Sequence, residues 1–256
     1  MVGTEQQTNV IDIHGLTKQY PGSTEWALRG INLSIHEGEF FGLLGPNGSG
    51  KTTLISILCG LLSSTQGRIT ICDHTLSRMR LAHIKQEIGL VPQEMALYPR
   101  LTFRENLRFF GRLYGIFGKK LEENVDCCIE IAGLEKYADW LIGKYSGGMK
   151  RRANLAVGLV HEPSVLFLDE PTVNVDPQSR EVIFKILTKL NAELKTTIIY
   201  TTHYLEEAQQ LCDRAAIIDH GVVIKIGTPH ELITSVPGAK DLREVFLLLT
   251  GRELRD

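Results

Sequence analysis

Short apolar runs alternate with longer stretches of helical periodicity along most of the chain. Nine of these runs are predicted strands, and three of them, Phe40–Leu44, Val165–Leu168 and Thr197–Thr201, are apolar on both faces. Continuous apolar runs of this kind are typical of parallel strands that are covered by helices on both sides. The other predicted strands are Val10–His14, Ile31–Ile35, Arg68–Ile71, Ile88–Val91, Ala215–Ile218 and Val222–Ile226. The pattern therefore predicts an α/β fold with a mostly parallel sheet.

Two parts of the chain depart from this alternation. Turn signals such as Pro21-Gly22 and Glu37-Gly38 bound the early strands, which indicates a smaller N-terminal antiparallel β layer. Between about residues 94 and 162 the strand signal disappears and helical periodicity takes over. We expect a helical subdomain there, inserted between two strands of the core. Because the chain has no low-complexity tract or Pro/Gly-rich linker, residues 1–256 are predicted to form a single domain.

Composition and charge exclude several classes of protein. The 256 residues are 43% hydrophobic and carry a net charge of −2, so no nucleic-acid partner is expected. No apolar run approaches the roughly 18 residues that a membrane span needs, and the polar N-terminus has no signal-peptide core. The five cysteines lack any C-x-x-C spacing and are interpreted as reduced thiols of a cytoplasmic protein. At a membrane, such a chain needs another subunit as its anchor.

A phosphate-binding loop follows the predicted strand Phe40–Leu44. It matches G-x-x-x-x-G-K-[ST] and consists of Gly45, Pro46, Asn47, Gly48, Ser49, Gly50, Lys51 and Thr52, with Thr53 added to the predicted binding set. The glycines let backbone N–H groups turn inward around an anion, and the start of the next helix adds its positive dipole end. Lys51 supplies a charge to the terminal phosphates, and the Thr52 hydroxyl is a ligand for Mg²⁺. ATP and Mg²⁺ are therefore the predicted ligands.

Two carboxylates and a histidine follow the next buried strands. Asp169 and Glu170 end the strand that begins at Val165, and His203 ends the strand that begins at Thr197. Beside a phosphate loop, Asp169 is suited to hold Mg²⁺ and Glu170 to accept a proton from an attacking water. A histidine at a strand end is more often structural. Its place at a neighbouring strand end favours contact with the terminal phosphate.

The segment Tyr145-Ser146-Gly147-Gly148-Met149-Lys150-Arg151-Arg152 resembles the L-S-G-G-Q signature of ABC ATPases. Ser146, Gly147 and Gly148 form a second anion-binding helix start. The resemblance implies that this helix start faces the nucleotide of a second ATP-binding subunit, either an identical copy or a close relative. It also implies a P-loop core and transmembrane permease subunits on separate chains.

Further motifs of that family occur in the expected order along nearly the whole chain. Tyr20 resembles the aromatic residue that stacks on adenine. Trp26 is a weaker candidate, and a core position is the alternative for both. Gln93 resembles the glutamine that binds Mg²⁺ and couples the core to the helical subdomain. Asp176 matches the aspartate loop at the dimer seam, and His203 matches the switch histidine.

Three positions depart from the family's commonest pattern. Tyr145 and Met149 stand where Leu and Gln are usual, and Asn174 stands where Gly is usual. Together with Gly227-Thr228-Pro229 and the tail from Leu242 to Gly251, the signature resembles that of drug and polysaccharide exporters. The adjacent Lys150, Arg151 and Arg152 are interpreted as a solvated helix face rather than a lipid-binding patch.

The predicted function is that of an ATP-hydrolysing motor subunit of an ABC transporter, peripheral on the cytoplasmic face of a membrane. Two alternatives were weighed. A non-transport ABC ATPase acting on DNA or ribosomes usually carries a long coiled coil, a zinc module or two cassettes, and none of these is apparent here. A stand-alone P-loop kinase leaves Ser146-Gly147-Gly148 and Asp176 without a function.

Overall fold

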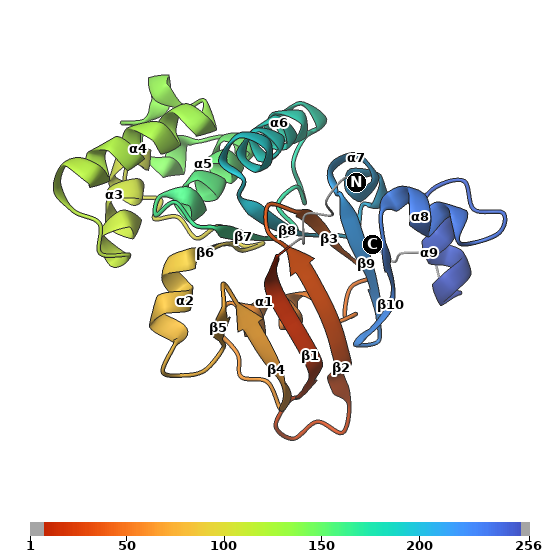
Figure 1. Cartoon of the computed structure of the whole chain (residues 1–256). Coiled ribbons are helices and arrows are strands. Elements are labelled where there is room, and N and C mark those ends of the chain that lie inside the picture. The colour runs from red at the N-terminus through yellow and green to blue at the C-terminus, as the bar shows by residue number, and fades with distance from the viewer. Residues whose placement is uncertain (1–7, 252–256) are drawn as a thin grey trace, which may run out of the picture.

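The computed structural model describes residues 8–251, which form two β-sheets with helices packed around them (Figure 1). The larger sheet has the strand order β10-β9-β3-β8-β7-β6, and every neighbouring pair is parallel except β10 with β9. Its strands are β3 (Phe40–Leu44), β6 (Ile88–Val91), β7 (Val165–Asp169), β8 (Thr197–Thr202), β9 (Arg214–Asp219) and β10 (Val222–Gly227). The predicted α/β class with a mostly parallel sheet is confirmed.

The smaller sheet is antiparallel and has the order β2-β1-β4-β5. It consists of β1 (Asn9–Gln19), β2 (Trp26–His36), β4 (Gln66–Ile71) and β5 (His74–Thr75). All nine predicted strands are present, and most extend beyond their predicted ends. The two-residue strand β5 was not predicted, because so short a segment carries no periodicity.

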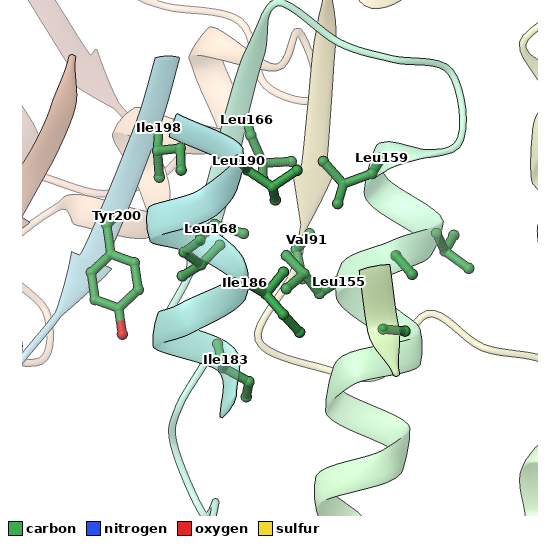
Figure 2. Packing of buried hydrophobic residues seen from close by; sticks show 14 of the residues in the cluster. Val91, Leu155, Leu159, Leu166, Leu168, Ile183, Ile186, Leu190, Ile198 and Tyr200 are labelled. Carbon is green, nitrogen blue, oxygen red and sulfur yellow. The ribbon is translucent and has the colours of Figure 1, made fainter. Parts of the chain in front are cut away.

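Apolar side chains cover both faces of the parallel sheet. Alternate residues of β3 and β7 contribute to two separate clusters: Phe41 and Phe167 face the antiparallel layer, whereas Phe40 and Leu168 face the opposite side. On that opposite side, β6, β7 and β8 pack against the helices α5 (Gly147–Leu159) and α6 (Pro177–Leu194), as Figure 2 shows. Burial on both faces explains why these strands are apolar without alternation.

The chain between β6 and β7 is helical. The residues there form α3 (Phe103–Leu113), α4 (Gly118–Ala132), the short 3₁₀ turns Glu135–Tyr137 and Ile142–Lys144, and α5. Thr102 begins α3 through a capping box with Glu105, which satisfies two backbone N–H groups at the helix start. The remaining helices are α1 (Lys51–Leu58), α2 (Leu81–Glu87), α7 (Leu205–Leu211), α8 (Pro229–Thr234) and α9 (Leu242–Thr250). Within residues 8–251, none of these helices combines the length and apolarity that crossing a bilayer requires.

Candidate functional site

The phosphate loop connects β3 to α1 at the carboxyl edge of the parallel sheet. Gly50 stands at the N-cap of α1 with φ of 108°, and none of the described side chains caps this helix start. A Cβ atom at Gly45 would lie 2.7 Å from Ser49 Oγ, and one at Gly50 would lie 2.8 Å from the carbonyl oxygen of Ala27. The backbone of the loop is therefore packed so closely that Gly45 and Gly50 leave no room for a side chain. The first N–H groups of α1 have no partner among the described side chains.

Lys51 lies buried over this loop. Its Nζ atom donates to the carbonyl oxygens of Gly45 at 2.8 Å and Pro46 at 3.1 Å, and lies 3.7 Å from Glu170 Oε1. Burial lowers the pKa of this ammonium, and the carboxylates of Glu170 and Asp169 oppose the shift only in part. A nearby phosphate would supply the negative charge that the buried ammonium lacks.

Asp169 joins two neighbouring elements at the end of β7. Thr201 pairs with it across the parallel strands, and the Thr201 hydroxyl donates to Asp169 Oδ1 at 2.7 Å. The Thr52 hydroxyl of α1 lies 3.4 Å from the same oxygen. The fold thus brings together the hydroxyl of Thr52 and the carboxylate of Asp169, two residues that lie 117 positions apart in the sequence.

Glu170 occupies a backbone conformation that residues with side chains rarely adopt. Its φ is 48°, and its N–H donates to Thr201 Oγ1 at 2.9 Å. Its carboxylate lies between two cationic or basic groups, with Lys51 Nζ 3.7 Å from one oxygen and His203 Nδ1 3.3 Å from the other. The structure thus brings Lys51, Thr52, Asp169, Glu170 and His203 into one constellation, as the sequence predicted.

This constellation fits the triphosphate and the magnesium ion that the loop motif implies. An uncapped helix start and a buried ammonium are complementary to phosphate oxygens. The oxygens of Thr52 and Asp169 are the hard donors that Mg²⁺ prefers. The donor set and the loop therefore suit these ligands on chemical grounds.

The starts of α5 and α6 are packed against each other. Ser146 is the N-cap of α5 and accepts from the N–H of Met149 at 3.2 Å, while Asp176 caps α6 by accepting from the N–H of Ser179 at 2.9 Å. Hydrogen bonds from the side chain and the N–H of Ser179 hold the pKa of Asp176 below its usual range. A Cβ atom at Gly148 would lie 2.7 Å from Ser179 Cβ, so this glycine is needed for close packing.

Gly147 differs from its neighbour. Apart from its chain neighbours and the nearby backbone of its own helix, no described heavy atom lies within 4 Å of the position that its Cβ would take. The hydrogen bonds and ion pairs of residues 8–251 do not connect Ser146 with the phosphate loop either. The two predicted anion-binding helix starts are therefore not joined by direct polar contacts in the part of the chain that the structure describes.

The interpretation of Arg151 as part of a solvated helix face is wrong. Its side chain is buried and donates to the carbonyl oxygens of Gln93 at 2.8 Å and Val173 at 3.2 Å. Arg152 is half-buried and donates to the carbonyls of Ala132 and Gly133 at the end of α4. The packing of α5 against three other segments, which the basic run alone does not reveal, turns these charges inward. Gln93 itself is exposed, directly after β6.

Tyr20 lies beside the start of α1. It is exposed, and its hydroxyl lies 3.1 Å from Thr53 Oγ1. Trp26, at the beginning of β2, is also exposed. A core position is thus excluded for both aromatic residues, and Tyr20 is the one in hydrogen-bond contact with α1.

Asn174 has a φ of 59°, in the left-handed region. Glycine adopts this region at no cost, and asparagine tolerates it better than most other residues. The departure from the family's usual glycine is therefore compatible with the same backbone turn between Glu170 and Asp176.

Three residues of the site were not predicted. Thr201 and Arg151 form hydrogen bonds to segments distant in sequence. Glu207 of α7 accepts from the distant Thr172 and from the nearer Tyr200 and Thr202. None of them belongs to a local motif that reveals its partners. A buried strand that carries the hydroxyl residues Tyr200, Thr201 and Thr202 was the one available signal.

The loop, the buried lysine and the strand-end carboxylates define a P-loop nucleoside triphosphatase. The family model described as ABC transporter matches residues 28–173, which is more than half of the chain. The chain therefore belongs to the ABC transporter family of ATP-binding proteins, which hydrolyse ATP.

Curated relatives and solved structures agree with this assignment. The chain is 44% identical over 229 residues to the linearmycin resistance ATP-binding protein LnrL of Bacillus subtilis, covering 90% of this chain and 72% of the relative. It is 42% identical over 236 residues to the Nod factor export ATP-binding protein I of Burkholderia lata, covering 92% and 76%.

Two solved structures are similar to this chain in fold and in sequence. The first is a dimeric ATP-binding cassette in a post-hydrolysis state with ADP and Pi, with a TM-score of 0.77 and 30% identity over 85% of this chain and 98% of that one. The second is cbiO1 from Clostridium perfringens, part of the ABC transporter complex cbiONQ, with a TM-score of 0.82 and 31% identity over 94% and 95%.

Proposed function

We propose that this chain is the motor subunit of an exporter for a drug, lipid or polysaccharide. It works as one of two ATP-binding subunits on the cytoplasmic face of a membrane, held there by separate transmembrane subunits. The names of the relatives, one from a resistance system and one from an export system, support the direction of transport and the class of cargo. The dimeric form of a similar cassette supports the pairing.

The observation that carries this proposal is the open space at Gly147. Ser179 of the same chain leaves no room for a side chain at Gly148, but nothing in the described chain accounts for the glycine at position 147. A glycine at this position is explained if the phosphates of a nucleotide on the second subunit approach the start of α5. Each nucleotide would then lie between the phosphate loop of one subunit and Ser146, Gly147 and Gly148 of the other.

The residues of the constellation have distinct roles in hydrolysis. Lys51 exchanges its contacts with the loop carbonyls for the terminal phosphates, and Tyr20 stacks on the adenine. Thr52, Asp169 and Gln93 would hold Mg²⁺, which would neutralise negative charge on the triphosphate. Asp176, at the start of α6, lies at the seam between the subunits.

Glu170 and His203 serve the attacking water. Glu170 takes a proton as the water oxygen bonds to the γ-phosphorus, and the bond to the β–γ bridging oxygen breaks to leave ADP and phosphate. His203, 3.3 Å from Glu170, holds the γ-phosphate beside that carboxylate. Closure around ATP and reopening after hydrolysis drive the partner subunits, because ATP binds the closed pair more tightly than the open one.

The surface that meets the membrane subunits is formed by exposed aromatic residues after β6. Tyr98 and Phe109 are exposed and pack edge to face, with ring centroids 4.9 Å apart, whereas Phe103 and Leu107 of the same segment are buried core residues. Exposed aromatic clusters of this kind are common at protein interfaces. We assign Tyr98 and Phe109 to the docking surface.

Affinity purification of the tagged chain from membranes tests this function. We expect a multi-span membrane protein to co-purify, and we expect Tyr98→Glu with Phe109→Glu to abolish its recovery. The matched control is Trp140→Glu, which changes another exposed aromatic residue of the helical segment and should retain the partner. Recovery of ribosomes or DNA-bound complexes, with no membrane protein, would contradict the proposal.

A further inference from the structure

Glu207 lies buried in the first turn of α7, at the centre of a group of hydroxyls. Only 3% of the residue is exposed. Its Oε2 atom accepts from the hydroxyls of Tyr200 at 2.8 Å and Thr202 at 2.9 Å, and the hydroxyl of Thr172 lies 2.9 and 3.0 Å from its two oxygens. Arg180 Nε is 3.5 Å from Oε1. One carboxylate therefore connects α7, β8, α6 and the segment after β7.

The partners of Glu207 are next to the reacting groups. Thr172 follows Glu170 by two residues, and Thr202 immediately precedes His203. The Thr202 hydroxyl also accepts from the N–H of Tyr204, so the turn that carries His203 is held on both sides. The contacts of Glu207 thus link the segment of Glu170 to the segment of His203.

Burying the Glu207 carboxylate costs free energy, which indicates that its benefit is to fix the positions of the segments around it. A carboxylate withdrawn from water is unfavourable unless its lone pairs are satisfied, and an apolar side chain would usually fill the same space at lower cost. Burial, together with the Glu207 carboxylate, raises the pKa of Tyr200 well above its ordinary value. The phenol therefore stays protonated and donates a hydrogen bond to Glu207. Three hydroxyl donors around an acceptor-only group define the position of each segment.

The backbone of Glu170 needs such support. Its left-handed conformation is unfavourable for a residue with a side chain and persists only where the surroundings hold the chain in place. The Thr201 hydroxyl fixes its N–H from the preceding side. The contact between Thr172 and Glu207 fixes the chain on the following side.

We propose that Glu207 is a positioning residue for ATP hydrolysis, which holds Glu170 and His203 at their mutual distance without contacting the nucleotide. The inference rests on the proposed role of Glu170 as the base. Loss of the carboxylate changes the orientation of the base but leaves the phosphate loop intact. We therefore expect loss of the Glu207 carboxylate to lower kcat and to leave the affinity for ATP nearly unchanged.

The test compares kcat, the Kd for ATP and the Tm of four variants. Glu207→Ala is expected to lower kcat about 10- to 100-fold, as misplacement of a reacting group does, while the Kd changes less than about threefold. Glu207→Gln keeps one acceptor oxygen and should retain most of kcat. Thr172→Val removes one hydroxyl at constant shape and should lower kcat in the same direction even if Glu207→Ala folds poorly.

Glu39→Ala is the matched control. Glu39 is similarly buried, with 6% exposed, and it pairs with Arg214 at 3.1 Å and accepts from the N–H of His36 at 2.8 Å at the opposite edge of the sheet. We expect it to lower Tm as Glu207→Ala does but to leave kcat unchanged.

Two results would overturn the assignment of Glu207. One is an unchanged kcat in both Glu207→Ala and Thr172→Val. The other is a parallel loss of kcat, ATP binding and Tm that Glu39→Ala reproduces. Glu170→Gln separates this failure from a failure of the proposed base: full turnover in that variant would remove Glu170 from the mechanism whatever Glu207 does.

Discussion

At the scale of single residues, the site combines a strained backbone with buried charge. Glu170 is left-handed, and its carboxylate lies between Lys51 and His203. Neither feature favours stability by itself, since positive φ and buried charge are both costly. Both place reactive groups at short distances in a site that the phosphate loop directs toward an anion.

Lys51→Ala tests the binding half of this arrangement. Removing the ammonium deletes charge-assisted hydrogen bonds worth about 1.5–3 kcal/mol, so the Kd for a fluorescent ATP analogue should rise roughly 10- to 150-fold. Lys189→Ala, which alters an exposed lysine of α6 paired with Glu193, should leave the Kd unchanged. Equal affinities of the wild type and Lys51→Ala would show that the loop does not hold the triphosphate.

The sequence predicted the place in the fold of residues whose position depends on local sequence. Lys51 begins α1 and Asp169 ends β7, whereas Glu170 and His203 directly follow β7 and β8. The carboxyl ends of parallel strands meet at one edge of the sheet, so these residues lie close together. Arg151 and Glu207 could not be assigned in this way. Their partners come from other segments, so the burial of Arg151 and the hydroxyl contacts of Glu207 emerge only from the packing of α5 and α7.

At the scale of elements, nine strands followed from apolar periodicity, because a strand buried on one or both faces must be apolar there. The packing of the start of α5 against the start of α6 could not be predicted from this periodicity. The contact between the starts of α5 and α6 depends on Gly148 and Ser179, whose proximity no periodicity encodes.

The pair Gly147→Ala and Gly148→Ala separates packing within the chain from contact between subunits. Gly148→Ala places a methyl group against Ser179 and should lower the free energy of unfolding by about 1–3 kcal/mol. Gly147→Ala meets open space and should keep or slightly raise stability, yet weaken ATP-dependent dimerisation. Chemical denaturation and light scattering measure the two effects. Unimpaired dimerisation of Gly147→Ala would place the start of α5 outside the interface.

At the scale of the whole molecule, the chain provides two helix starts that we propose to bind phosphate, and no described polar contact connects them. One follows β3 in the core, and the other begins α5, the last helix between β6 and β7 (Figure 1). The fold class, the family and the ATPase activity could all be predicted from the motifs. The cargo could not, because nothing in the motifs of an ATP-binding subunit contacts it. The central claim is therefore that two such subunits together complete each nucleotide site.

Light scattering of Glu170→Gln, with and without ATP and Mg²⁺, tests that claim most directly. Without its base, the variant should bind ATP, fail to hydrolyse it and accumulate as a dimer that disappears when the nucleotide is removed. The double variant with Gly147→Ala should remain largely monomeric at the same ATP occupancy. A Glu170→Gln protein that binds ATP but stays monomeric, with undiminished turnover, would contradict both the base and the shared site.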